Sequence, residues 1–443
     1  MKKILMLLVL ISTTIAQSQI LAERERSKVI DQILAERFNQ VLPELMDRTE
    51  IDMWIVIARE YNEDPVLRTM LPSTWLNARR RTILVFNRSN AEDTIEKLAI
   101  ARYNIGDNIE SAWNKEEQPD QWKALIDIIK ERDPESIGLN ISENFGIADG
   151  LVKTDYDEFM QVLPEDFQDR IVSAEDLAVG WIETRTLREM VIYSSLVETT
   201  HSIIEEAFSK NVIEPGITTT DDVVWWMRQK VTELGLETWF HPTVDIQRTN
   251  EELIDHITAF SDENGSDVIL HGDLLHCDFG ITYLRLNTDC QQMAYVLKAE
   301  ETKAPDFLVE AFQKGNQLQD ILTSNFETSQ TGNEILSKSL AEAKDQGLKA
   351  SIYTHPLGLY GHSAGPTIGM WDQQGGVPGT GDYPLYENTV YAIELNTEVE
   401  LDEWGKSIRI MLEEAGFWGE DGFRYVNQRQ RDLMLIPSEK ASN

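Results

Sequence analysis

The first part of the chain alternates between helical and extended patterns of hydrophobic residues. Apolar residues at three- and four-residue spacing predict a helix over Gln19–Leu42, which Pro43 is expected to end. Short runs rich in β-branched and aromatic residues predict three strands, at Met53–Ala58, Thr82–Phe86 and Ile137–Ile141. A further helix is expected over Gln121–Ile129. The alternation predicts an α/β domain over residues 17–182, which contains no histidine and no cysteine.

A different organisation begins at residue 183. A long one-faced apolar pattern follows Glu183 and predicts a helix that ends at Glu214–Gly216. Thr219, with Asp222 three residues later, is a typical start for a second helix. Strand-like runs follow, and all seven histidines and both cysteines lie in this part of the chain. We therefore expect residues 183–443 to form a second domain that carries the chemistry.

The first sixteen residues predict a secretory signal peptide. Two lysines precede the apolar run Ile4–Ile11, and small residues lead to Ala16, after which cleavage is expected. The run is shorter than the roughly 20 residues that span a bilayer. An uncleaved amphipathic N-terminal helix is the alternative. The mature protein is therefore expected to be exported, either periplasmic or secreted.

Charge limits the partners that this protein can bind. The sequence has 40 Lys and Arg against 76 Asp and Glu, a formal net charge of −36. Such a surface repels polyanions and anionic membranes, so neither a nucleic acid nor a membrane is an expected partner. The basic run Arg79–Arg81 is too short to reverse the sign of a whole face.

Two aspartates lie on neighbouring strand-like runs within Asp273–Val296. If these runs form an antiparallel hairpin with its tip between Tyr283 and Leu284, Asp278 and Asp289 face each other across the ladder. Opposed carboxylates repel unless they share a divalent cation. The alternative is that both are solvated on an exposed face, or that one of them begins a turn.

Two histidines and a glutamate form the other candidate elements. His355 and His362 flank two glycines in the segment THPLGLYGHSAG, where tight backbone geometry can bring the two rings toward one point. This suits one metal-ligating and one acid–base histidine. Glu394 lies in the β-run TVYAIEL, where a buried carboxylate is costly without a cation and an edge strand would leave it in water.

The order of these residues resembles the M24 metallopeptidases, the creatinase/aminopeptidase or pita-bread family. The shared pattern is an Asp, a second Asp eleven residues later, a His in an HxxGxxxH element and a Glu at the end of a β-run. The two-domain layout is similar to the Xaa-Pro aminopeptidase and prolidase branch. The resemblance covers residues from about 185 to about 437 and implies an α/β creatinase-like domain followed by an α+β pita-bread domain.

The resemblance also implies a metal centre. Asp278 and Asp289 would bridge or chelate two divalent ions, His355 would bind one of them and Glu394 would bridge them. Manganese is the first expectation, with cobalt, zinc or iron as alternatives, because all four accept such ligands.

Three residues would carry the catalytic roles in this resemblance. Glu394 would accept the proton of the attacking water, and His362 would contact the substrate or stabilise the tetrahedral intermediate. His256 is a looser match for a substrate-facing histidine, and a surface position in a helix is its alternative.

Two positions depart from the family pattern. Ser363 stands where a Glu normally follows the second histidine. Met411 stands where the fifth ligand, a Glu two residues after Arg409, is expected, and a thioether binds hard divalent ions poorly. Strand alternation places Arg409, Met411 and Glu413 on one face, so a bulge or shifted register could let Glu413 serve instead. Without Glu413 the site keeps four ligands and one tightly held metal.

The two cysteines share the hairpin with the aspartates. In the expected register Cys277 and Cys290 oppose each other on the other face of the ladder. A disulfide is one alternative in an exported chain, but two buried thiols are favoured because cross-strand bridges strain the ladder.

Together these features and the resemblance predict an exported metal-dependent peptidase that cleaves short peptides. The resemblance to the Xaa-Pro branch implies release of the residue before a proline, and it also implies a homodimer. Two alternatives stay open: a catalytically inactive pita-bread binding protein with a degraded metal centre, or a non-peptidase C–N hydrolase of the creatinase type. Met411 and Ser363 favour the inactive protein. The four remaining ligands argue against it, because buried carboxylates without a metal cost stability.

Overall fold

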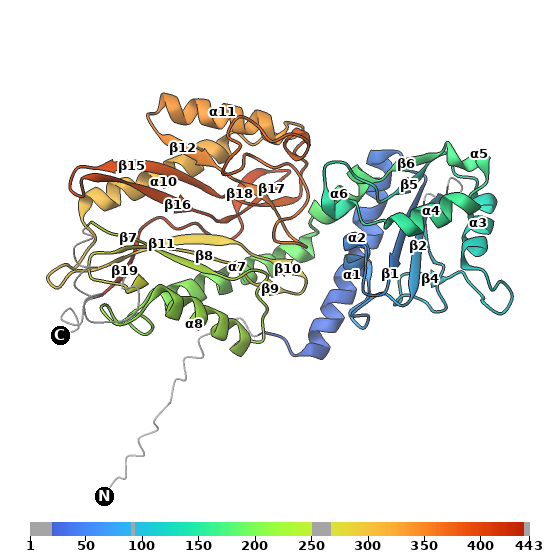
Figure 1. The fold of residues 1–443 in the computed structure, drawn as a ribbon, viewed down its shortest axis with the longest axis horizontal. Helices are drawn as coiled ribbons and strands as arrows, with labels where there is room; N and C mark the ends of the chain where they lie inside the picture. Colours follow the sequence, from blue (N-terminus) through green and yellow to red (C-terminus); the bar gives the residue numbers. More distant parts are fainter. Residues whose placement is uncertain (1–19, 90–93, 250–266, 438–443) are drawn as a thin grey trace, which may run out of the picture.

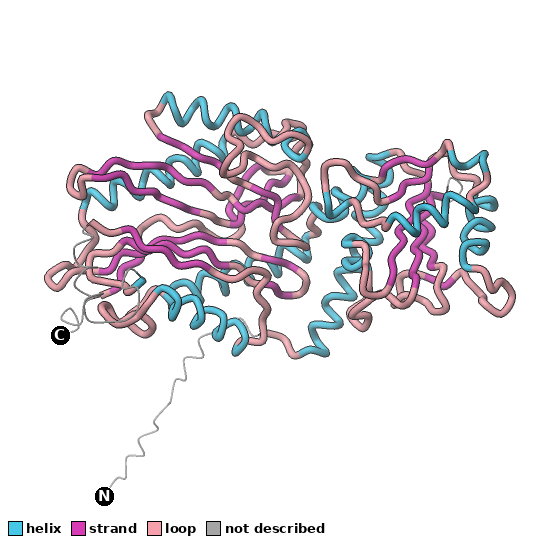
Figure 2. The backbone as a smooth tube through the Cα atoms, viewed as in Figure 1, coloured by secondary structure: helices cyan, strands magenta, loops and turns pink. Residues whose placement is uncertain are grey.

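Two bodies lie side by side in the computed structural model, which describes residues 20–89, 94–249 and 267–437 (Figure 1). The predicted signal peptide and His256 lie outside these residues. Helices flank the strands in both bodies (Figure 2). None of the helices in the described ranges is long and apolar enough to cross a membrane.

The N-terminal body is built on a mixed six-stranded sheet in the order β4-β3-β2-β1-β5-β6. Its strands are β1 (Met53–Arg59), β2 (Arg81–Ser89), β3 (Thr94–Ala99), β4 (Glu110–Ser111), β5 (Ile137–Leu139) and β6 (Ile171–Ser173). The three predicted strands form its centre, β1, β2 and β5. The sequence patterns did not predict β3, β4 and β6, which are short or largely exposed on one face.

Alternate residues of β1 supply two hydrophobic layers, one on each side of the sheet. Trp54 and Val56 pack toward the layer that contains helices α1, α2 and α6, whereas Met53 and Ile55 pack toward α3, α4 and α5. These helices span Glu23–Thr49 (α1), Pro65–Met70 (α2), Gln121–Arg132 (α3), Lys153–Val162 (α4), Glu165–Gln168 (α5) and Glu175–Glu183 (α6). Both faces of the central strand are therefore buried, as its continuous apolar run requires.

Helix α1 does not end where the sequence predicts. It continues through Pro43 to Thr49. Leu45 and Met46, in the turn after the proline, are almost completely buried in the domain core. The apolar burial of this last turn offsets the backbone hydrogen bond that Pro43 cannot donate.

The second body places helices on both outer sides of its sheets (Figure 1). Its helices are α7 (Leu187–Ala207), α8 (Thr220–Glu233), α10 (Asp306–Ser324) and α11 (Gly332–Asp345). The predicted capping box at the start of α8 is confirmed, because Thr219 and Asp222 bond each other's backbone N–H groups. Helix α7 ends at Ala207, several residues before the predicted stop at Glu214–Gly216.

Among the described residues, the strands of the second body form three sheets and a short hairpin. One sheet has the order β19-β11-β8-β7, the next β12-β15-β16, the third β13-β14-β17-β18, and β9 pairs with β10. The strands are β7 (Thr243–Gln247), β8 (Leu274–Phe279), β9 (Thr282–Tyr283), β10 (Leu286–Asn287), β11 (Cys290–Val296), β12 (Lys349–Ile352), β13 (His355–Leu357), β14 (Thr389–Ala392), β15 (Leu395–Leu401), β16 (Lys406–Leu412), β17 (Ala415–Gly419), β18 (Gly422–Tyr425) and β19 (Met434–Ile436).

A buried ion pair joins the two bodies. The Arg37 guanidinium in α1 donates to the Glu189 carboxylate at the start of α7, at 3.0 Å and 3.1 Å, and Arg185 donates to it at 3.2 Å. All three side chains are buried. The ion pair therefore ties α1 to the second body. Removing one partner would leave a buried charge uncompensated, which is strongly destabilising.

Candidate metal centre

The hairpin that carries the two aspartates pairs in a different register from the predicted one. β8 and β11 oppose Asp278 with Gln291, so the prediction that Asp278 directly faces Asp289 is wrong. The turn explains the shift, because Leu284 and Arg285 both have positive φ angles, 52° and 68°. A two-residue turn of this kind suits the twist of a hairpin and places the tip one residue further along the chain than expected.

The same shift separates the cysteines. Cys277 opposes Gln292, and Cys290 opposes Phe279. Both cysteines are free and fully buried, and burial raises the pKa of each thiol. The favoured expectation of two buried thiols is therefore confirmed, and such thiols are chemically inert.

Asp278 and Asp289 nevertheless converge. One oxygen of each lies within 4.8 Å of the other and of an oxygen of Glu413. Asp289 directly precedes β11, so it approaches Asp278 on the diagonal of the ladder rather than across it.

Glu394 and Glu413 enter the centre from the points where the chain passes between sheets. Glu394 lies between β14 and β15, and Glu413 lies between β16 and β17. The last pair of the β15–β16 ladder is Leu395 with Leu412, so the two glutamates flank the end of that ladder. The ladder is regular from there to Leu401. Glu413 therefore reaches the centre by plain strand alternation, without a bulge.

Met411 is the residue that the family pattern places at the fifth ligand. It lies within β16 opposite Asn396, and the clusters of potential metal ligands in the described part of the chain are formed by His, Cys, Asp and Glu side chains. Glu413, two residues further on, is 1% exposed and belongs to two of them. The carboxylate that enters the centre therefore lies two residues beyond Met411, at Glu413.

His355 completes the arrangement from the start of β13. Its Nε2 atom lies 3.6 Å from Asp289 Oδ2 and 3.6 Å from Glu413 Oε1. Its Nδ1 atom is 3.0 Å from the backbone oxygen of Pro356, which fixes Nε2 as the atom that faces the carboxylates. The ligand atoms of His355, Glu394 and Glu413 all lie within 4.8 Å of one another.

Four buried atoms at this centre lack hydrogen-bond partners. They are Asp278 Oδ1, Asp289 Oδ1, His355 Nε2 and Glu413 Oε1. Leaving such atoms without a partner is costly, and four of them converging on one place is rare in a folded protein. Carboxylate oxygens with one imidazole nitrogen suit first-row divalent ions. The residues present therefore fit a site for divalent metal ions.

The electrostatics of the centre also suit the binding of cations. Burial raises the pKa of Asp278 well above its ordinary value, and the carboxylates of Asp289 and Glu413 raise it further. Burial likewise raises the pKa of Glu413 and brings that of Glu394 to about 7. Burial lowers the pKa of His355, but the adjacent Asp289 and Glu413 outweigh it and raise the pKa well above its usual range. Divalent cations would remove this repulsion between carboxylates.

Gln291 is a residue of the centre that the sequence did not reveal. Its side-chain amide donates to Glu394 Oε1 at 2.6 Å and to Glu413 Oε2 at 2.9 Å. Its amide oxygen is 2.9 Å from Nε2 of His276 in β8. Gln291 thus links the carboxylates of Glu394 and Glu413 through its side-chain amide. A single glutamine in a buried strand carries no sequence signal for this role.

Gln292 and Glu414, which directly follow Gln291 and Glu413, form a second set of buried contacts next to the centre. Glu414 follows Glu413 and accepts hydrogen bonds from Gln292 at 2.8 Å and from the backbone of Gln430 at 3.1 Å. His201 Nε2 in α7 lies 2.6 Å from the same carboxylate. These buried contacts fix the backbone on which Glu413 is carried.

His362 lies beside the centre rather than within it. Its ring centroid is 4.8 Å from that of His355, and its ring packs edge-on against Trp239 at 5.2 Å. The residue is accessible to solvent, but nearby protein atoms partly desolvate its ring, and this desolvation together with the charge of His355 lowers the pKa of His362. Its ligand atom lies within 4.8 Å of those of Asp289 and His355. A substrate at the carboxylates would therefore contact His362 from the solvent side.

Comparison with known proteins agrees with this geometry. Residues 195–413 match the model of metallopeptidase family M24. The resemblance to the M24 metallopeptidases is confirmed. The matched part of this M24-like chain begins in α7 and ends at Glu413, so it includes each of the five converging ligand candidates. No curated protein matches the sequence significantly.

Solved structures similar to this M24-like protein cover nearly all of its length. The X-Pro aminopeptidase from Thermotoga maritima MSB8 is 17% identical, with 88% of this chain and 99% of that chain covered and a TM-score of 0.60. The Xaa-Pro dipeptidase from Bacillus anthracis is 15% identical, with 94% and 100% covered and a TM-score of 0.54. The prolidase from Pyrococcus horikoshii OT3 is 15% identical, with 93% and 100% covered and a TM-score of 0.52. The predicted fold class, an α/β creatinase-like domain followed by an α+β pita-bread domain, is confirmed.

Proposed function

We propose that this protein is a metal-dependent peptidase that releases the N-terminal residue from short Xaa-Pro peptides. The observation that carries the proposal is the convergence of Asp278, Asp289, His355, Glu394 and Glu413 on one buried place. Two divalent ions bound there would act as Lewis acids and lower the pKa of water. Manganese is the proposed metal, with cobalt, zinc or iron as alternatives.

The side chains of the protein supply the remaining steps of hydrolysis. Glu394 accepts a proton as water attacks the scissile carbonyl and returns it to the departing amine, so that the C–N bond breaks and water is consumed. His362 donates to the developing oxyanion from the solvent side of the centre. Gln291 keeps Glu394 in place through its 2.6 Å hydrogen bond.

Substrate class, location and assembly belong to the proposal as well. The named structural neighbours include enzymes that act on Xaa-Pro bonds, which supports proline after the cleaved residue. The net charge of −36 is compatible with binding a free α-amino group. We propose export to the periplasm or the medium and a homodimer, with short peptides and neither nucleic acid nor membrane as partners.

A panel of small peptides tests the proposal. Purified protein with added Mn²⁺ is incubated with Ala-Pro, Ala-Pro-Ala, Ala-Ala-Ala and N-acetyl-Ala-Pro-Ala, and products are identified by mass spectrometry. We expect alanine release from the two unblocked Pro peptides only, and its loss in Asp289→Asn. Cleavage of the acetylated peptide, or equal cleavage of Ala-Ala-Ala, would contradict the proposed specificity.

The alternatives predict different results. An inactive binding protein would cleave none of the peptides. A metal-free C–N hydrolase would have an activity that neither added Mn²⁺ nor a metal chelator changes. The buried carboxylate of Glu413 weighs against a degraded centre, because it restores the fifth ligand position that Met411 vacates.

A further inference from the structure

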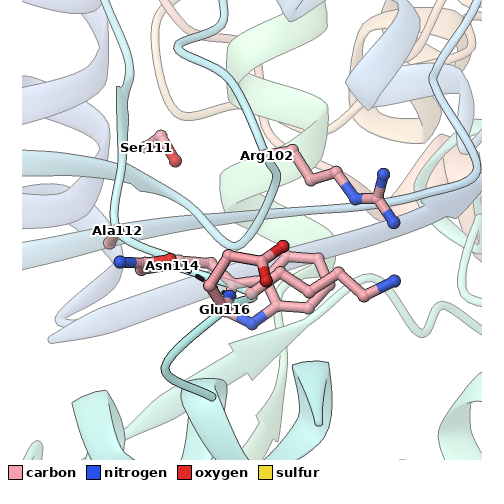
Figure 3. Close-up of a pocket in the computed structure, with 7 residues that line it drawn as sticks. Arg102, Ser111, Ala112, Asn114 and Glu116 are labelled. Carbon is pink, nitrogen blue, oxygen red and sulfur yellow. Dashed lines mark hydrogen bonds between the residues drawn. The ribbon is translucent and has the colours of Figure 1, made fainter. Parts of the chain in front are cut away.

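The basic run at residues 79–81 forms part of a pocket in the N-terminal body that the proposed peptidase function does not use. The pocket has a volume of about 670 Å³ and adjoins a second one of about 610 Å³, with which it shares Arg102 and Trp113. Four arginines and three aromatic residues line the larger pocket, among them Trp75, Arg79, Arg80, Arg102, Tyr103 and Trp113. Figure 3 shows Arg102 on one side of the adjoining pocket, with Asn114 and Glu116 across from it.

Positive charge in these pockets lacks acidic partners. Arg79, Arg80, Arg102 and Lys115 form no ion pair with any residue in the described ranges. Arg81 differs, because it pairs with Asp155 at 2.9 Å and with Glu158. In a chain with 76 acidic and 40 basic residues, four neighbouring cations without a partner form a local reversal of charge.

Two acidic side chains also line the pockets without cancelling this charge. Glu60 accepts a hydrogen bond from the backbone N–H of Arg80 at 3.2 Å, so one of its oxygens is already used. Glu116 is exposed on the rim, where its backbone N–H donates to Asn114 at 3.1 Å. The cations outnumber these two carboxylates.

Flat side chains lie among the cations. The Arg79 guanidinium carbon lies 4.3 Å from the ring centroid of Trp75 and 5.9 Å from that of Tyr103. Trp75 is 9% exposed, whereas Tyr103 is 55% exposed. Arginine beside Trp and Tyr is the combination that binds planar anions, since the guanidinium supplies charge and forked donors and the rings supply stacking surface.

The backbone around the pocket is held in place. Arg80 has a φ of 59°, and Glu60 N donates to Arg80 O at 2.6 Å. Trp113 Nε1 donates to Gln118 O at 2.7 Å, and Gln121 Nε2 donates to Ile100 O at 2.6 Å. Because these contacts form without a ligand, binding would cost little ordering of the pocket wall.

We propose that this pocket binds a small organic anion, a carboxylate or phosphate attached to a flat apolar ring. The anion would pair with Arg79, Arg80 and Arg102, and the ring would lie against the exposed Tyr103, beside the stacked pair of Arg79 and Trp75. The proposal concerns a different part of the molecule from the metal centre and does not depend on peptidase activity.

Titration calorimetry with 2-naphthalenesulfonate tests the proposal. This probe carries a flat ring and an oxyanion that binds metals weakly, while sulfate carries only the charge and 2-naphthol only the ring. We expect 2-naphthalenesulfonate to bind the full-length protein at least tenfold more tightly than either. Absence of binding, or sulfate binding as tightly as the probe, would overturn the proposal.

Two variants locate the binding. Arg79→Ala/Arg102→Ala is expected to weaken 2-naphthalenesulfonate binding at least tenfold, and both residues are exposed, so the fold should persist. Arg424→Ala is the matched control, because Arg424 is also exposed and lies 4.7 Å from the Phe417 ring in β17. Equal binding by the wild type, the double variant and Arg424→Ala would show that the probe binds outside this pocket and would overturn the proposal. A change in oligomeric state of the double variant would also overturn the proposal, since the pocket would then belong to a contact between copies of the chain.

Discussion

Gln291 and Glu413 are joined by three hydrogen bonds. Their backbones exchange two, Gln291 N to Glu413 O at 3.0 Å and Glu413 N to Gln291 O at 3.1 Å. The side-chain amide of Gln291 adds a third at 2.9 Å and also donates to Glu394. The strand that follows Asp289 thus fixes both glutamates relative to the aspartates.

Replacing Gln291 should therefore weaken metal binding while the fold is preserved. We expect Gln291→Leu to lower Mn²⁺ affinity about 10- to 100-fold, because residues that orient metal ligands have effects of this size. Competition with a fluorescent chelator measures the affinity independently of activity. Gln292→Leu is the matched control, since its neighbouring buried amide supports Glu414 instead. Equal losses in the two variants would show that Gln291 does not position the ligands.

His362 should act on turnover and not on metal binding. Its exposed ring lies beside His355, so we expect His362→Ala to lower kcat about 10²- to 10³-fold, the cost of one lost oxyanion donor. Metal content should match that of the wild-type protein in elemental analysis. His241→Ala is the control, because His241 is also exposed and lies 5.3 Å from a Trp225 ring. Loss of metal from His362→Ala would assign it a ligand role instead.

Glu183 should make the stability of the protein depend on pH. Burial raises its pKa to about 8 from an ordinary 4.5, and Arg48, the Tyr383 hydroxyl and Arg185 offset this only in part. The folded protein therefore holds this proton more tightly than the unfolded chain does. The resulting stabilisation is complete below about pH 4.5 and is lost as pH rises toward 8.

In the variant Glu183→Gln the side chain at this position stays neutral at every pH of the measurement. The free energy of unfolding of the variant relative to wild type should thus increase with pH between about 5 and 8, by up to about 1.4 kcal/mol per pH unit. Urea denaturation at four pH values measures it, with the exposed Glu420→Gln as the control. A difference that stays constant across this range would contradict the assignment.

The cysteines should be reduced in the native protein. Cys277 and Cys290 are not cross-strand partners, and both are buried in the core of the second body. We expect two thiols per chain when the protein is denatured without reductant and treated with Ellman's reagent. A count near zero would show that the two are bridged.

Several elements were predictable because the signal lies in local pattern. The β-branched runs of β1, β2 and β5 and the Thr219 capping box are of this kind. Residue order was also enough to select Asp278, Asp289, His355 and Glu394, which the structure brings together. For Glu413, strand alternation raised only the possibility of a ligand role, through a bulge or a shifted register, and left the question open.

The remainder depends on tertiary contacts that no short segment encodes. The hairpin register rests on a turn at Leu284 and Arg285, neither of which is typical of positive φ, so the pattern favoured a tip one residue earlier. Continuation of α1 beyond Pro43 depends on burial of Leu45 against the sheet. Gln291 acquires its role only when β11 meets the end of β16.

Metal content per chain is the most direct test of the central claim that Glu413, and not Met411, completes a dinuclear centre. Elemental analysis of wild type, Glu413→Gln and Met411→Leu, purified with Mn²⁺, would be paired with Ala-Pro-Ala hydrolysis before and after chelation. We expect nearly two metals and chelator-sensitive cleavage in wild type and Met411→Leu, and at most one metal with strongly reduced cleavage in Glu413→Gln. A metal-free wild type without turnover, or a Glu413→Gln protein that keeps both metals, would contradict the account.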